Sequence, residues 1–117
     1  MSDVKQKYIN ILRIELKDLE QDIDHLIQKC EIEKQESNLP AYIYLENLAL
    51  FKNELLGLSV FDQILDDVQP ESFNSLDEMI EYLKKRCHEK IDAHGLAEAV
   101  NNYVDRRLQK VAKYVEN

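Results

Sequence analysis

The sequence has few of the residues that turn a polypeptide chain. Only two glycines and two prolines occur among its 117 residues. A β-rich chain would need turn residues at intervals of about 8–12 positions. Their scarcity excludes a β-sandwich or β-barrel and predicts long helices joined by few connections.

Long apolar runs are also missing, and cysteine is scarce. The uninterrupted apolar runs are only a few residues long, so no membrane-spanning helix is predicted. The polar N-terminus offers neither the apolar stretch of a signal peptide nor a lipidation motif, so the cytosol is the expected compartment. Cys30 and Cys87 each fall on an apolar helical stripe, where we expect buried free thiols rather than redox or metal-binding groups.

Basic residues are too few to balance the acidic ones. The chain has 23 acidic and 15 basic residues, a formal net charge of −8, and so repels nucleic acid and anionic membrane surfaces. Residues 1–67 hold 14 acidic and 7 basic side chains, whereas residues 68–117 hold 9 and 8. We therefore expect the two parts to lie side by side, and we expect neither a nucleic-acid nor a membrane partner.

Apolar residues at helical spacing are what the sequence does contain. A first helix is predicted over about 3–36, where residues recur at alternating intervals of three and four. This seam consists of Ile9, Leu12, Leu16, Leu19, Ile23, Leu26 and Cys30. All seven are expected to face neighbouring helices.

A second helix is predicted over about 40–67 and is the most apolar element. Of the 28 residues from Ala41 to Val68, 17 are hydrophobic. A helix that is apolar on most sides lies in the middle of an assembly or presents a face that another chain covers. Gly57 could end this helix, but we favour a continuous helix in which the glycine marks a close helix crossing.

A third helical region is predicted over about 75–115. Ser75 followed by Glu78 matches the capping box, in which each side chain satisfies a backbone N–H of the first turn. Gly95 is suited to a helix C-terminus, and a break there would divide the region in two. The prediction is thus one all-α domain over residues 1–117, an antiparallel helical bundle of three long helices, or of four if the last one breaks near Gly95.

Several acidic and histidine residues could in principle form a metal centre for a hydrolase or an oxidase. A di-metal bundle needs carboxylates and imidazoles that converge from different helices. The candidates do not show that pattern, because most of them lie on one predicted helix among lysines and arginines. They are Asp22, His25, Glu78, Glu81, His88, Glu89 and Asp92. We therefore predict no catalytic residue, cofactor or metal, and keep the metal-dependent enzyme as the alternative.

The favoured prediction is a non-catalytic module that binds a protein partner or a second copy of itself. It depends on the surplus of apolar residues on the second helix and on the lack of converging polar groups. Residues off the principal apolar stripes are the candidates for the contact surface. They are Tyr42, Ile43, Leu50, Val60, Tyr103 and Tyr114.

Overall fold

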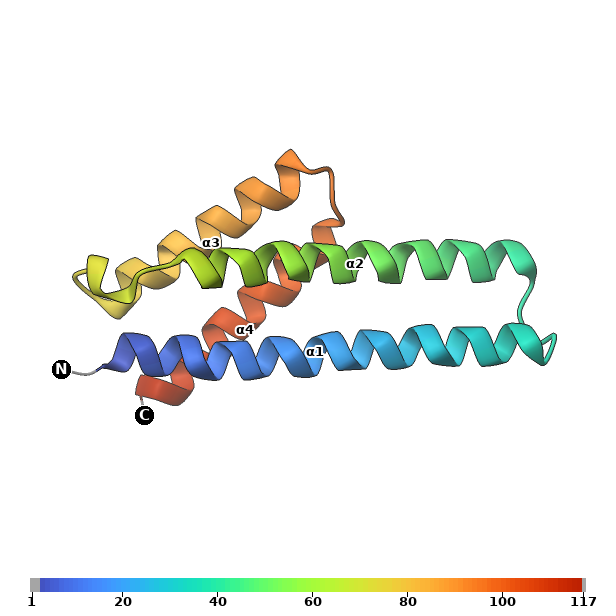
Figure 1. The fold of residues 1–117 in the computed structure, drawn as a ribbon, viewed down its shortest axis with the longest axis horizontal. Coiled ribbons are helices and arrows are strands. Elements are labelled where there is room, and N and C mark those ends of the chain that lie inside the picture. The colour runs from blue at the N-terminus through green and yellow to red at the C-terminus, as the bar shows by residue number, and fades with distance from the viewer. Residues whose placement is uncertain (1–2, 117) are drawn as a thin grey trace.

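The fold is all-α, as predicted. The computed structural model describes residues 3–116, and within them it contains four α-helices, one short 3-10 helix and no strand (Figure 1). The elements are α1 (Val4–Gln35), α2 (Ala41–Asp67), η1 (Pro70–Ser72), α3 (Leu76–Ala93) and α4 (Glu98–Glu116). Among these residues no helix is both long and apolar enough to cross a lipid bilayer.

The choice between three and four helices is decided at Gly95. Gly95 has a φ of 64° and follows the last turn of α3. Its N–H bonds to the carbonyl of Asp92, and the N–H of Leu96 bonds to the carbonyl of Ile91. This pair of bonds is a Schellman motif, which satisfies the last carbonyls of a helix and turns the chain away. The predicted third helical region is therefore two helices.

The connection between α1 and α2 is built in the same way without a glycine. Ser37 has a φ of 59°, its N–H bonds to the carbonyl of Lys34, and the N–H of Asn38 bonds to the carbonyl of Glu33. Pro40 is the residue before the first turn of α2 and accepts a hydrogen bond from the N–H of Tyr44. A left-handed serine thus closes the longest helix of the molecule.

The helices do not form a regular up-and-down bundle. In Figure 1, α1 and α2 run antiparallel along the full length of the molecule, which measures 56 × 29 × 19 Å, while α4 crosses them obliquely and α3 diverges from α2. The carboxylate of Glu15 contacts Arg107 at 3.8 Å and Lys110 at 2.9 Å. The acidic first part and the more basic last part therefore do meet.

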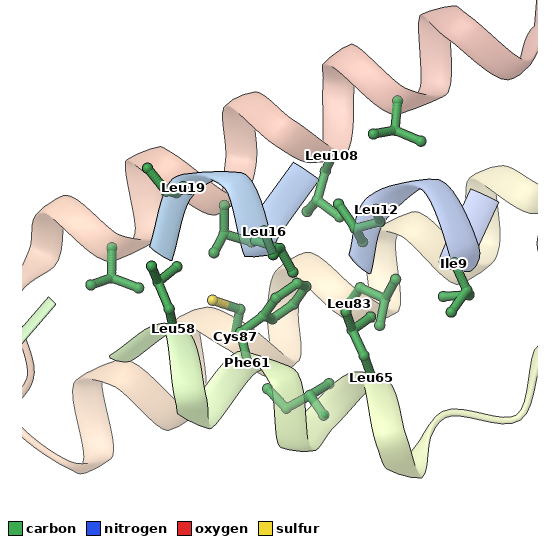
Figure 2. Close-up of a cluster of buried hydrophobic side chains, with 14 of the residues drawn as sticks. Ile9, Leu12, Leu16, Leu19, Leu58, Phe61, Leu65, Leu83, Cys87 and Leu108 are labelled. Carbon is green, nitrogen blue, oxygen red and sulfur yellow. The ribbon is translucent and has the colours of Figure 1, made fainter. Parts of the chain in front are cut away.

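All four helices contribute to one hydrophobic core. Figure 2 shows Leu16, Phe61 and Cys87 pointing into the space between the helices, and each is at most 1% exposed. Tyr8 is also fully buried, and its hydroxyl donates a 2.9 Å hydrogen bond to the carbonyl of Leu108 in α4. The bond satisfies a polar group that would otherwise be buried alone.

Gly57 lies within a continuous α2, as favoured from the sequence, and marks a helix crossing. A Cβ atom built on Gly57 would come within 2.7 Å of Cγ2 of Val100 in α4. Real Cβ atoms do not approach a carbon atom this closely. The missing side chain therefore lets α4 lie directly against α2.

The core does not extend along the whole α1–α2 pair. Among residues 3–116, no member of the core cluster lies between Ile23 of α1 and Leu58 of α2. We call residues 24–53, the part of this hairpin beyond the core, the arm, and the rest of the molecule the body. The prediction that Leu26 is buried in the seam is wrong, because its side chain is 46% exposed. The N-terminal end of α4 does not reach far enough along the hairpin to cover it.

Candidate functional site

The residues considered for a metal centre are not brought together. Within residues 3–116, no group of three or more His, Cys, Asp or Glu side chains is placed to hold a metal ion. Asp22 and His25 are exposed on α1. The others lie on α3, and all of those except the half-buried His88 are exposed: Glu78, Glu81, Glu89 and Asp92. Glu78 serves the helix start, where its backbone N–H donates to Ser75 Oγ and its carboxylate accepts from the N–H of Asn74.

The polar groups between α3 and α4 pair with one another. His88 Nε2 lies 3.0 Å from both carboxylate oxygens of Asp105. The thiol of Cys87 lies 3.6 Å from Oδ1 of Asn101, and burial raises the pKa of this thiol to about 12. A thiol with so high a pKa remains protonated at neutral pH and is a poor nucleophile. These contacts connect α3 to α4.

The start of α4 is held by polar side chains of α2. Asn53 Oδ1 accepts a 2.7 Å hydrogen bond from the N–H of Ala97. One residue later, Glu54 is only 4% exposed and its carboxylate lies 3.4 Å from the hydroxyl of Tyr103. Burial raises the pKa of the Glu54 carboxyl. These contacts of Asn53 and Glu54 lie at the boundary between the arm and the body.

A carboxyl pair that the sequence did not reveal joins α1 to α2 in the body. Burial, followed by the hydrogen bond that the protonated Glu20 carboxyl donates to the neighbouring Asp62, raises the pKa of Glu20 to about 7. The two residues lie 42 positions apart and on different helices, so no spacing in the sequence points to them.

The arm exposes apolar side chains on the side that α4 would cover if it extended further at its N-terminal end. Leu50, 47% exposed, precedes Gly57 by two helical turns, and Gly57 touches α4. Leu26 follows Glu15, which also touches α4, by 11 residues, or about three turns. Half-buried Ile43 lies two turns before Leu50. We call Leu26, Ile43 and Leu50 the α4-side face of the arm.

A second apolar line lies on another side of α2. Tyr42, Leu45 and Leu56 are 66%, 62% and 55% exposed, and exposed Ala49 lies between them at heptad spacing. Leu45 and Leu50 are five residues apart, which places them about 140° apart around the helix. The two lines are therefore distinct surfaces, and we call the second one the outer stripe.

The remaining contact candidates have different surroundings. Val60 and Tyr103 are half-buried and pack against the core, whereas Tyr114, near the end of α4, is 66% exposed. Of the predicted contact residues, Tyr42, Ile43 and Leu50 lie on the arm. Leu26 was not among them, because it continues a seam whose earlier members are all buried. Only the length of α4 distinguishes Leu26 from them.

Comparison of the chain with protein-family models, with curated proteins and with solved structures finds no match in any of the three.

Proposed function

We propose that this chain is a non-catalytic helical module that self-associates through the α4-side face of its arm. The observation that carries the proposal is the concentration of exposed apolar residues on a two-helix projection in which Cys30 is the one fully buried side chain. Among residues 3–116, ten large hydrophobic residues are strongly exposed, and five of them lie within residues 24–53: Leu26, Ile32, Tyr42, Leu45 and Leu50.

A second copy fits this face because, in the body, another helix covers the corresponding side of α1 and α2. In the body, α4 packs against both α1 and α2, and these two helices continue side by side along the arm past the start of α4 (Figure 1). Two arms placed face to face would supply each other with two helices and complete a four-helix arrangement. Such a contact is symmetric, so the same residues serve both copies.

The expected dimer is weak. Each helix of the arm contributes 12 or 13 residues, which corresponds to about 18–20 Å of helix. A face of this length belongs to the small class of interfaces, below about 1,200 Å² of total buried surface. We expect a dissociation constant of about 1–100 μM.

Sedimentation equilibrium at loading concentrations of about 1–200 μM tests the proposal. We expect a monomer–dimer equilibrium for the natural sequence and at least a tenfold weaker dimer for Leu50→Gln. The loss is large because a symmetric contact removes each leucine twice, at about 1.5–3 kcal/mol per buried leucine. Leu45→Gln is the matched control, since it removes an exposed leucine from the outer stripe of the same helix.

Two results would contradict this assignment. The first is a monomer at every concentration. The second is a dimer that Leu45→Gln dissociates and Leu50→Gln leaves intact.

We also propose a reducing compartment such as the cytosol, because both cysteines are buried as free thiols.

A further inference from the structure

A cleft between α2 and α3 is not used by the proposed self-association. It has a volume of about 250 Å³ and lies where α3 diverges from α2 (Figure 1). Val60 and Ile64 of α2 give it an apolar wall, and Ser59 and Gln63 add polar groups beside them. The volume is slightly below the 300–1,000 Å³ that is usual for ligand sites, so a small ligand fits best.

The opposite wall of the cleft is a row of side chains on α3 and on His94, the residue that follows its last turn. Tyr82, Arg86, Lys90 and His94 follow one another at four-residue intervals, so successive helical turns present them on the same side. Asp67, the acidic residue that also lines the cleft, lies beside Tyr82, since these two residues line a neighbouring hollow together. Arg86, Lys90 and His94 therefore lie toward the end where the helices diverge.

Two cations, Arg86 and Lys90, line this cleft in a molecule with a net charge of −8. Within residues 3–116, Arg86 has a 3.8 Å contact to Glu89, and Lys90 has no carboxylate within 4.0 Å. Both cations lie beside the apolar wall of Val60 and Ile64, which gives the cleft a charged side and an apolar side.

We propose that this cleft binds a small organic anion, an apolar body of about one ring that carries a carboxylate or a phosphate group. Its charged group lies between Arg86 and Lys90, where charge-assisted hydrogen bonds are available. Its ring lies against Val60 and Ile64, and Tyr82 closes the far end. The inference does not rest on the proposed self-association.

Titration of the full-length ¹⁵N-labelled chain by NMR at pH 7 and low ionic strength tests the assignment. The probes are phenyl phosphate, phenylacetate, inorganic phosphate and neutral benzyl alcohol. We expect saturable shifts at the amides of Ser59, Val60 and Gln63 with at least one of the two aromatic anions. Whichever binds more tightly identifies the charged group. Benzyl alcohol and inorganic phosphate should each bind at least fivefold more weakly, because each lacks one half of the ligand.

Matched charge variants distinguish specific binding in the cleft from non-specific electrostatic attraction of the anion to the protein. Lys90→Gln and Arg86→Gln should each weaken binding by about fivefold or more, a loss in the range of one partly exposed charge-assisted bond. Lys85→Gln makes the same charge change on the exposed side of α3 and should weaken binding less than twofold. Gln63→Glu, on the exposed edge of α2, should also weaken binding and provides a test that leaves the buried face of α3 unchanged.

The outcomes decide the proposal in either direction. Circular dichroism first establishes that each variant remains helical. Equal losses for Lys85→Gln and Lys90→Gln, equal binding of benzyl alcohol, or no saturable shift with either aromatic anion would each overturn the proposal.

Discussion

Ser37 and Gly95 occupy equivalent positions in two Schellman motifs, although only one of them is a glycine. Both have a φ close to 60°, a conformation that costs a side-chain-bearing residue roughly 1 kcal/mol. Ser37→Gly should therefore raise the free energy of unfolding by up to about 1 kcal/mol. Gly95→Ala should lower it by a similar amount, even though a Cβ at Gly95 meets no atom within 4 Å. Urea denaturation of both variants measures the two effects, and a destabilised Ser37→Gly would contradict the explanation.

The carboxyl group of Glu20 makes stability depend on pH. Burial and the hydrogen bond with Asp62 raise its pKa from 4.5 to about 7 in the folded chain. Between these two values the folded chain holds a proton that the unfolded chain has lost. The free energy of unfolding contributed by this group therefore falls as the pH rises through this window. Burial of Glu54 acts in the same direction.

Glu20→Gln should remove part of this dependence and raise the melting temperature at pH 8 relative to the natural sequence. The neutral amide removes the charge that burial and Asp62 disfavour. Asp18→Asn, an exposed change on the same helix, is the control. Thermal melts at pH 5 and pH 8 distinguish the two variants. An equal response of both would mean that overall charge, rather than the Glu20–Asp62 pair, sets the dependence.

At the scale of the helices, the crossing of α2 and α4 depends on the size of one residue. Gly57→Ala places a Cβ within 2.7 Å of Val100. We expect it to destabilise the fold by about 1–3 kcal/mol, because overpacking outweighs the gain in helix propensity. Val100→Ala removes the obstructing methyl groups. The double variant should therefore be more stable than the sum of the two single changes implies, which a double-mutant cycle of unfolding free energies measures.

The positions of the helices were predictable because each has a strong local signal. The heptad seam marked α1, and the pair Ser75 and Glu78 marked the start of α3. Gly95 marked a possible break, but whether the chain turned there depended on tertiary packing that no local pattern encodes. The crossing angles of the helices were not predictable either. Heptad spacing favours helices with nearly aligned axes, whereas α4 crosses α1 obliquely.

The candidate site was only partly predictable for the same reason. Surplus apolar residues on the second helix correctly indicated more apolar surface than the body covers, and Leu50 was named from them. Leu26 continues the heptad spacing of the buried Ile23, but its side chain is exposed. The two environments differ because α4 does not reach Leu26, which the sequence does not show. The sequence did not indicate a cleft at Arg86 and Lys90, since it does not show that α3 diverges from α2 beside them.

At the scale of the whole molecule, stability should be unevenly distributed. Regions with few buried apolar contacts open more readily than a packed core. Amides of residues 24–53 should therefore exchange with solvent at least tenfold faster than helical amides near Leu16 or Leu83, as hydrogen-exchange mass spectrometry measures. Raising the protein concentration from about 2 to 200 μM should slow exchange in the arm alone if two arms pair. Uniform protection along α1 would contradict this division into arm and body.

Figure 1 places the start of α1 and the end of α4 at the same end of the molecule, opposite the tip of the arm. A dye, tag or solid support attached at either end is therefore separated from residues 35–41 by most of the 56 Å length. Tethering the protein in this way would leave the tip pointing away from the support, accessible to whatever approaches from solution.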